Sequence, residues 1–245
     1  MLMRFVDLVR TNPFLRNLKS SFSIISEFSH TPHKSIMREL AKSTDFQIID
    51  AGANVGQFGV DMRKAGFYGQ IFSYEPVSES FRQLEKTIGS FQPWKAFQLA
   101  LGSAESKMEI NISGNSGLSS SILEMKEIHL RNFPESRTVA KELVCVSTIN
   151  RQVESLCLNP QNILLKIDVQ GYELQVLNGA DEYLNQIPFC FLEVSLKPLY
   201  ENESSLLDLL NLLAKYGHEV TEVFRGVKSK RGELLQLDVL TKKIS

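Results

Sequence analysis

The chain has 245 residues, of which 43% are hydrophobic and 22% charged, and its 27 Lys and Arg and 28 Asp and Glu residues give a net charge of -1. A chain without a basic surplus lacks the electrostatic footprint of a nucleic-acid-binding protein, so nucleic acid is not an expected partner. The length suits one large α/β domain with a substantial core. No apolar run approaches the roughly 20 residues of a membrane-spanning helix, so no transmembrane segment is expected.

Residues 1–44 precede the first chemically informative motif. Apolar residues at helical spacing, such as Phe5 and Leu8, predict one or two helices here. We expect an N-terminal helical extension that packs on a main domain at residues 45–245. Because basic residues alternate with the apolar ones, a lid over the substrate or a surface for a membrane or partner is the alternative. His33 is expected in a polar loop.

The stretch FQIIDAGANVGQFG, residues 46–59, has the pattern of a strand, a glycine-rich turn and a helix. Its apolar β-branched residues predict a buried strand that ends at Asp50. Gly52 and Gly56 suit a sharp turn and a close approach of the backbone to a ligand, because they carry no Cβ. A helix expected over about 54–65 presents backbone N–H groups and the positive end of its dipole to that ligand.

Beyond this motif, predicted strands and helices alternate along the chain. The further strands that we expect are 70–74, 94–101, 107–112, 142–147, 162–169, 188–195, 218–225 and 234–241. The alternation predicts a Rossmann-like, doubly wound α/β fold with a mostly parallel sheet. The last two strands have no helix between them, which predicts one antiparallel strand at the edge. The small, polar segment 114–121 is expected to be a loop.

Four acidic residues fall at the predicted ends of buried strands: Asp50, Glu75, Asp168 and Glu193. In doubly wound sheets, ligands bind beyond the carboxyl ends of the strands, so these residues predict one shared binding cleft. Glu75 follows Gly52 at roughly the distance at which a carboxylate accepts hydrogen bonds from ribose hydroxyls. The cleft is therefore expected to bind a cofactor that contains a nucleoside.

The glycine loop distinguishes between two such cofactors. A dinucleotide fingerprint is GxGxxG, which places a pyrophosphate at a helix N-terminus, whereas this loop begins with Asp50 and carries Ala53 and Asn54 between its glycines. S-adenosyl-L-methionine has an ammonium and a carboxylate instead. An acid at the strand end can meet the ammonium directly or through water, and loop amides can meet the carboxylate. The cofactor-binding candidates are Asp50, Gly52, Asn54, Gly56, Glu75, Pro76 and Asp168.

Two motifs together resemble a known family. DAGANVGQFG followed by YEP resembles the cofactor half of class I S-adenosylmethionine-dependent methyltransferases, and LLKIDVQGYELQVLNGA, residues 164–180, more specifically resembles the FkbM family. FLEVS at 191–195 and LLQLDVLTKK at 234–243 agree in spacing, so the resemblance covers about residues 46–243. It implies a seven-stranded sheet, S-adenosyl-L-methionine as the cofactor and methyl transfer to oxygen in glycan, polyketide or related biosynthesis.

Two alternatives to this function belong to other classes. The first is an NAD-dependent oxidoreductase, against which the DAGANVG loop counts. The second is a non-catalytic nucleoside-binding module, which has no physical need for the whole set of strand-end acids and glycines. The expected acceptor is a hydroxyl of a sugar, glycan or other small metabolite. Because the sequence has no Asp and Asn cluster typical of Mg²⁺-dependent catechol methylation, no metal is expected.

Methyl transfer to a hydroxyl requires an aligned acceptor and is helped by a base that takes the hydroxyl proton. Asp168 is the first candidate for that base, and its alternative role is to hold the cofactor or to cap the next helix. Lys166 faces the same side of the strand, where it either pairs with an acid or binds an anionic substrate. Glu193 is the third catalytic candidate in the cleft.

The substrate-binding candidates are Glu173, Ser119 and Ser120. Glu173 either lines the substrate pocket or caps a helix N-terminus, and the serines either contact a ligand or belong to a solvated connection. His129 is expected on the surface. Three cysteines, odd in number and far apart, predict buried free thiols in a reducing compartment and therefore a cytoplasmic protein.

Overall fold

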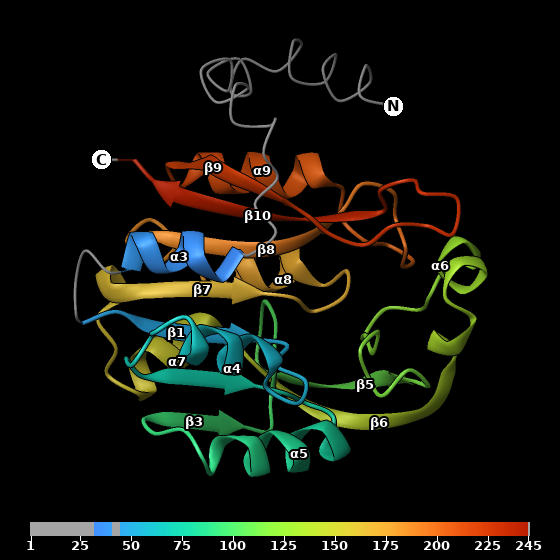
Figure 1. Ribbon diagram of the computed structural model, residues 1–245, viewed down its shortest axis with the longest axis horizontal. Helices are drawn as coiled ribbons and strands as arrows, with labels where there is room; N and C mark the ends of the chain where they lie inside the picture. Colours follow the sequence, from blue (N-terminus) through green and yellow to red (C-terminus); the bar gives the residue numbers. More distant parts are fainter. Residues whose placement is uncertain (1–31, 41–44, 245) are drawn as a thin grey trace.

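The computed structural model describes residues 32–40 and 45–244 (Figure 1). The helices that we predict before residue 32 lie outside the described residues. The larger sheet contains the strands β1 (Gln47–Ala51), β2 (Ile71–Tyr74), β3 (Trp94–Phe97), β7 (Ile163–Ile167), β8 (Phe189–Ser195), β9 (His218–Arg225) and β10 (Gln236–Lys243). They lie in the spatial order β3-β2-β1-β7-β8-β10-β9.

The pairs among β3, β2, β1, β7 and β8 are parallel, whereas β10 runs antiparallel to both β8 and β9. The mostly parallel, seven-stranded α/β sheet is therefore confirmed. Its antiparallel strand lies one place in from the edge, because β9 and β10 form a hairpin and β9 takes the outer position. In Figure 1 the arrowheads of β2, β3 and β7 point to one side and that of β10 to the other.

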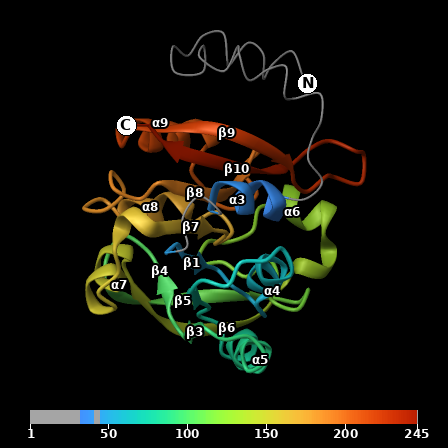
Figure 2. The same ribbon diagram turned by 60° about the vertical axis from the view of Figure 1, so that its left-hand side comes forward.

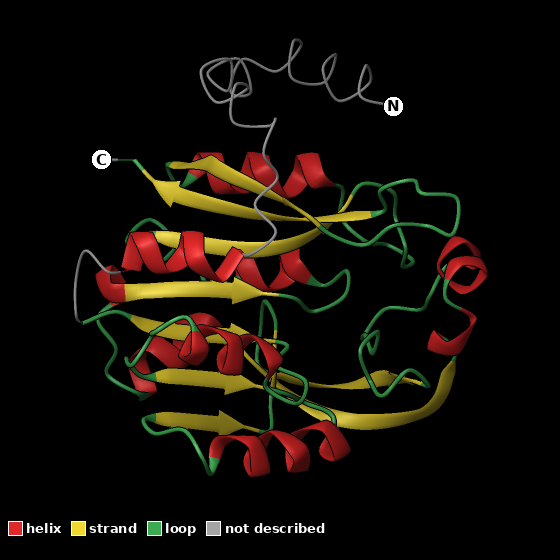
Figure 3. Cartoon of the chain, viewed as in Figure 1, coloured by secondary structure: helices red, strands yellow, loops and turns green. Residues whose placement is uncertain are grey.

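Helices cover both faces of this sheet (Figures 2 and 3). One face carries α3 (Pro32–Leu40), α4 (Gln57–Lys64) and α5 (Ser78–Ile88), and the other carries α7 (Ile149–Ser155), α8 (Glu173–Asn178) and α9 (Leu206–Lys215). The strands are apolar on both sides because each is buried on both sides. Ile48 and Leu164 pack toward α3 and α4, whereas their neighbours Ile49 and Leu165 pack toward α7, α8 and α9.

A second sheet of three strands lies beyond the carboxyl ends of the parallel strands. It consists of β4 (Ala100–Leu101), β5 (Ser106–Ser113) and β6 (Thr138–Ser147), in the order β4-β6-β5. The single strand predicted over 94–101 is thus wrong, because a turn after Phe97 separates β3 from β4 and sends them to different sheets. The chain between β5 and β6 carries the serine-rich loop and α6 (Glu127–Asn132), seen at the right of Figure 1.

The segment before the main motif contributes to the same core. α3 buries Ile36 and Leu40 against residues of β1 and β7. His33 lies in the first turn of this helix, so its expected loop position is wrong. The division of the chain at residue 45 stays a prediction. None of the helices in the described ranges is long and apolar enough to cross a membrane.

Candidate functional site

The glycine loop between β1 and α4 is held by three residues with positive φ, namely Gly52 at 75°, Asn54 at 46° and Gly56 at 94°. The helix begins only at Gln57, three residues later than predicted. A Cβ on Gly52 would lie 1.8 Å from the backbone oxygen of Asp168. Glycine is therefore required at position 52 by the close approach of the chain after β7, and the close approach to a ligand stays a prediction.

Asp50 and Lys166 form a buried pair beneath this loop. Lys166 Nζ lies 2.9 Å from Asp50 Oδ1, and the side chains are 6% and 0% exposed. Lys166 also donates to the backbone oxygens of Gly52 at 2.7 Å and Ala51 at 3.3 Å. Burial acts to lower the pKa of Lys166, but Asp50 and the other nearby carboxylates outweigh it and raise that pKa. The ammonium stays charged and holds the loop.

The contacts of Asp50 and Lys166 bear on the roles that the sequence predicts for these two residues. Asp50 Oδ2 accepts a hydrogen bond from Ser73 at 3.0 Å, and Ser73 accepts one from Trp94 Nε1. A fully buried carboxylate with these partners does not reach a ligand directly. Lys166 pairs with an acid, which was the first of its two predicted roles, and its donors serve Asp50 and the loop backbone.

Glu75 follows the carboxyl end of β2 and supports the loop from the other side. Its Oε2 accepts the N–H of Asn54 and its Oε1 accepts the N–H of Val77, each at 2.9 Å. The side chain is 6% exposed and lines the cavity described below. Burial raises the pKa of Glu75 to about 7, although the two backbone donors oppose the shift. Glu75 is thus a carboxylate whose charge changes near neutral pH.

Asp168 and Glu193 are joined by a single amide. Gln170 Nε2 donates to Asp168 Oδ1 and to Glu193 Oε2, each at 2.8 Å, and Gln170 Oε1 accepts the hydroxyl of Tyr200 at 2.9 Å. Gln170 has a positive φ of 55°, a conformation that costs free energy for a side chain other than glycine. The Asp168 side chain is 37% exposed and lies 3.8 Å from Lys166 Nζ. The two carboxylates are therefore fixed in position but open to a ligand.

Asp238 is a further acid of the site, and the sequence analysis did not single it out. It lies on β10 directly opposite Glu193 in the antiparallel register. Burial raises the pKa of Asp238 to about 7, with Asp168 adding to the shift. The search for acids at strand ends missed this residue because β10 runs in the opposite direction. The start of an antiparallel strand lies at the edge where the parallel strands end.

A cavity of about 430 Å³ brings these groups together at the carboxyl ends of β1, β2, β7 and β8. The predicted candidates that line it are Gly52, Asn54, Glu75, Pro76, Ser120, Lys166, Asp168 and Glu193. Phe58 and Phe191 also line it, and their rings stack at 5.9 Å with an interplanar angle of 20°. The ring of His33 lies 5.4 Å from that of Phe58, so α3 contributes to the wall as well.

Two predicted substrate-binding residues lie outside the cavity lining. Glu173 is buried and its Oε1 accepts the N–H groups of Val169 and Gly171, which fixes the turn after β7. Glu173 therefore holds the turn before α8, and neither of these two hydrogen bonds caps the first turn of the helix. Ser119 Oγ accepts a hydrogen bond from Asn115, and the Ser119 backbone oxygen accepts the hydroxyl of Tyr200. The serine loop reaches the cavity through its neighbours instead.

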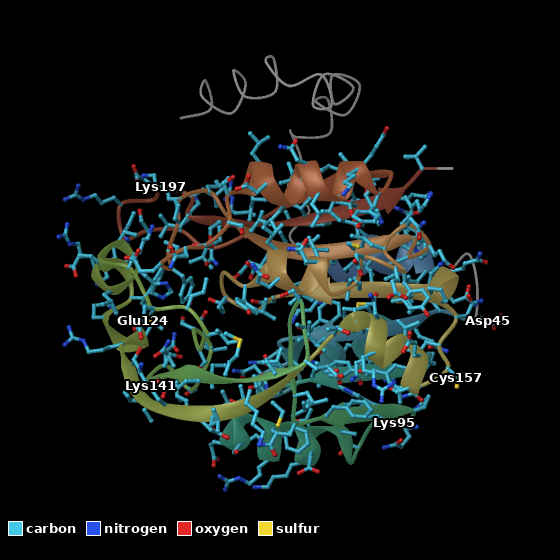
Figure 4. All side chains as sticks on the ribbon, turned by 180° about the vertical axis from the view of Figure 1, so that it is seen from behind. Asp45, Lys95, Glu124, Lys141, Cys157 and Lys197 are labelled. Carbon is cyan, nitrogen blue, oxygen red and sulfur yellow. The ribbon has the colours of Figure 1, made fainter. Side chains whose placement is uncertain are left out.

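Two expectations about exposure are wrong. His129 is only 3% exposed and packs edge-on against Phe133 and Tyr200, because α6 folds back onto the chain that follows β8. Cys145 and Cys157 are exposed free thiols, and Cys157 is visible at the periphery in Figure 4. Cys190 is buried as predicted.

The cavity fits the chemistry of S-adenosylmethionine. Glu75 has both oxygens fixed by backbone donors and still lines the cavity, so it can accept a hydrogen bond from a ribose hydroxyl. Leu99 and Leu101 supply apolar surface near it for an adenine ring. Gly52, Ala53 and Asn54 of the loop and Val169 after β7 line the same cavity. The fit therefore involves the loop, β2 and the segment after β7.

The fold and this cavity define a class I S-adenosylmethionine-dependent methyltransferase. The chain belongs to the FkbM methyltransferase family, whose domain model, described as "Methyltransferase FkbM domain", matches residues 50–220. S-adenosyl-L-methionine is the cofactor, which overturns the NAD alternative. The match ends before β10 and begins after α3, so Asp238 and His33 lie outside it.

Individual proteins similar to the chain include the following. The chain is 27% identical over 205 residues to the 2-O-methyltransferase NoeI of Sinorhizobium fredii, covering 80% of this chain and 82% of NoeI. It is 30% identical over 156 residues to the methyltransferase sdnD of Sordaria araneosa, covering 55% of this chain and 60% of sdnD. Among solved structures, magnesium protoporphyrin IX methyltransferase from Synechocystis matches with a TM-score of 0.46 and 10% identity, over 86% and 78% of the two chains.

Proposed function

We propose that the protein transfers a methyl group from S-adenosylmethionine to a hydroxyl of a sugar, glycan or other small metabolite. The observation that carries this proposal is the position of Asp168. Its carboxylate is partly exposed, lines the cavity and is fixed by Gln170, while the lysine next to it is engaged by Asp50. A fixed carboxylate beside a cofactor loop is suited to accept the proton of an attacking hydroxyl.

For this reaction the protein has to align the two reactants and to accept one proton. S-adenosylmethionine, when bound, supplies an electrophilic methyl group on a sulfonium. The acceptor oxygen forms a bond to this carbon as the carbon–sulfur bond breaks, and the hydroxyl proton passes to Asp168. Gln170 keeps the carboxylate in place during this step. Alignment of two bound reactants can contribute about 7 to 11 kcal/mol to catalysis.

The relative NoeI supports oxygen as the acceptor atom, since its name describes a 2-O-methyltransferase. Because the two chains are 27% identical, NoeI supports the kind of acceptor atom, oxygen, and not the identity of the acceptor molecule. The cavity adds independent support because its polar groups include carboxylates and amides, which bind hydroxyls through hydrogen bonds.

Methyl transfer from cofactor labelled in the methyl group, with the product examined by NMR, tests the proposal. Incubation with methyl glycosides of neutral sugars is expected to place the label on oxygen. Asp168→Asn is expected to lower kcat by about 10²- to 10⁴-fold, the usual contribution of a general base, with little change in the affinity for S-adenosylhomocysteine. Label on nitrogen or carbon, or full turnover of Asp168→Asn, would overturn the corresponding part of the proposal.

A further inference from the structure

Asp238 is a carboxylate of the cavity whose side chain accepts no hydrogen bond from the described residues. It is half-buried on β10 and lines the cavity opposite Glu193. Within residues 32–40 and 45–244, no group donates a hydrogen bond to its side chain, in contrast to Asp50, Glu75, Asp168 and Glu193. A partly desolvated carboxylate without a donor is unfavourable. A ligand that donates a hydrogen bond to Asp238 relieves that cost.

Glu193, on the same wall of the cavity, can accept further hydrogen bonds. Gln170 and Gln236 both donate to its Oε2, each at 2.8 Å. Its Oε1 has no donor among the described residues. Because Asp238 and Glu193 face each other across β10 and β8, their unused oxygens form a pair of hydrogen-bond acceptors. Two neighbouring hydroxyls on one molecule suit such a pair.

The charge of the cavity restricts what can bind there. Its lining contains the acidic residues Asp61, Glu75, Asp168, Glu193 and Asp238, and its lysine, Lys166, is neutralised by the buried Asp50. Burial raises the pKa of Glu75 and Asp238 to about 7, so the wall is most negative above that pH, where it repels a phosphate or carboxylate on the acceptor. An amine would be held as ammonium, since nearby carboxylates favour the charged form, and an ammonium has no lone pair with which to attack the methyl group.

The aromatic surface completes the description of the acceptor end. Phe58 and Phe191 line the cavity next to the acidic wall, on the same face of the sheet as Lys166 and Glu193. A ring that carries hydroxyls at its edge and C–H groups on its face can use both surfaces at once. The acidic and aromatic surfaces of the cavity thus match an uncharged polyhydroxylated ring better than an anionic one.

We propose that Asp238 binds a hydroxyl of the methyl acceptor, together with Glu193, and that it restricts the acceptor to uncharged polyhydroxylated compounds. This inference rests on the proposed O-methylation, because it concerns the acceptor of that reaction. It assigns a specificity role to a residue beyond the segment 50–220 that matches the family.

The test uses the full chain and a defined panel of acceptors. The panel contains methyl α-L-fucoside, methyl β-D-glucoside, glucuronic acid, glucose 6-phosphate and glucosamine, each assayed with methyl-labelled cofactor. Wild type is expected to methylate at least one neutral glycoside with a higher kcat/KM than either anionic sugar. Asp238→Asn is expected to raise KM for that glycoside about tenfold, in line with the loss of a hydrogen bond to a charged group, while the Kd of S-adenosylhomocysteine changes less than twofold.

Two further variants keep the result interpretable. Asp238→Lys is expected to shift the preference toward glucuronic acid or glucose 6-phosphate, and Asp181→Asn, an exposed change on another part of the chain, is expected to match wild type. Faster methylation of an anionic sugar by wild type, or an unchanged KM in Asp238→Asn with an unchanged melting temperature, would overturn the inference and leave O-methylation standing. Label on no hydroxyl in the panel would instead count against the proposed function.

Discussion

Lys166 Nζ lies 2.9 Å from Oδ1 of Asp50, and both side chains are almost completely removed from solvent. Asp50 lies next to the end of β1, and Lys166 lies on the adjacent strand β7, directly opposite it in the register. The ion pair therefore joins the cofactor strand to the strand that leads into the proposed base, Asp168. Because Lys166 also binds two backbone oxygens of the glycine loop, one side chain connects the sheet to the loop.

Lys166→Met is expected to reduce the free energy of unfolding by about 3 to 5 kcal/mol, because it leaves the charge of Asp50 buried and unpaired. Urea denaturation measures this. The double variant Asp50→Asn/Lys166→Met removes both charges and is expected to recover part of the loss. Lys64→Met breaks an exposed ion pair with Asp61 and is expected to be neutral. A loss no larger than that of Lys64→Met would contradict the structural role of Lys166.

Cofactor affinity is expected to depend on pH through Glu75. Burial raises the pKa of this carboxyl to about 7, so it is charged at pH 8 and mostly protonated at pH 6. A charged carboxylate is the stronger hydrogen-bond acceptor, and the affinity for S-adenosylhomocysteine is therefore expected to fall about three- to tenfold from pH 8 to pH 6. Calorimetry at the two pH values measures the change.

Glu75→Gln is the matching variant, and it is expected to bind weakly at both pH values. Its amide can accept only one of the two backbone N–H groups that Glu75 accepts. Glu79→Gln, on the exposed first turn of α5, serves as the control with wild-type behaviour. An equally steep pH dependence in Glu75→Gln would exclude Glu75 as its source.

Gln170 is expected to position the acids of the site without being needed for folding. Gln170→Gly relieves the positive φ, so the melting temperature is expected to stay close to that of wild type. Burial raises the pKa of Glu193 and the Gln170 amide opposes that rise. Loss of the amide is therefore expected to move the acidic limb that Glu193 contributes to the pH–rate profile to higher pH, while kcat falls because the base Asp168 is no longer held. Gln170→Asn tolerates the same backbone but is too short to reach both carboxylates, and should behave similarly. An unshifted profile in both variants would refute the role.

His129 is expected to make stability depend on pH. Burial lowers its pKa below the usual value near 6.5, so the folded protein holds the neutral ring while the unfolded chain takes up a proton below that pH. The contribution of His129 to the free energy of unfolding is fully present above about pH 6.5. It is lost as the pH falls toward the pKa of His129 in the folded protein, by up to about 1.4 kcal/mol per pH unit.

His129→Phe tests this directly. Neither ring nitrogen of His129 has a hydrogen-bond partner among the described residues, and its neighbours Phe133 and Tyr200 are aromatic. The variant is therefore expected to be more stable than wild type, with the difference growing from pH 7.5 to pH 5.5 in thermal or urea unfolding. Wild type and His129→Phe both retain His218, whose pKa is also lowered by burial. The difference in stability between the two proteins therefore reports on His129. A constant difference across this range would contradict the assignment.

Much of the site could be predicted from sequence because parallel strands share one carboxyl edge. Asp50, Glu75, Asp168 and Glu193 were found from strand ends alone, and three of them line one cavity. The same rule could not find Asp238, which lies near the start of the antiparallel β10. Strand direction depends on how the final hairpin docks, and neither periodicity nor composition encodes that directly.

The amino-acid sequence by itself determined the alternation of strands and helices, the glycine loop and the family. These are local properties, because backbone conformation and side-chain period act over a few neighbouring residues. The tertiary structure decided how each acid is held. Asp50 pairs with Lys166, Asp168 and Glu193 are linked through Gln170, and Asp238 has no donor in the part of the chain that the structure describes. Such pairings join residues far apart in the chain, so the packing of the sheet alone brings them together.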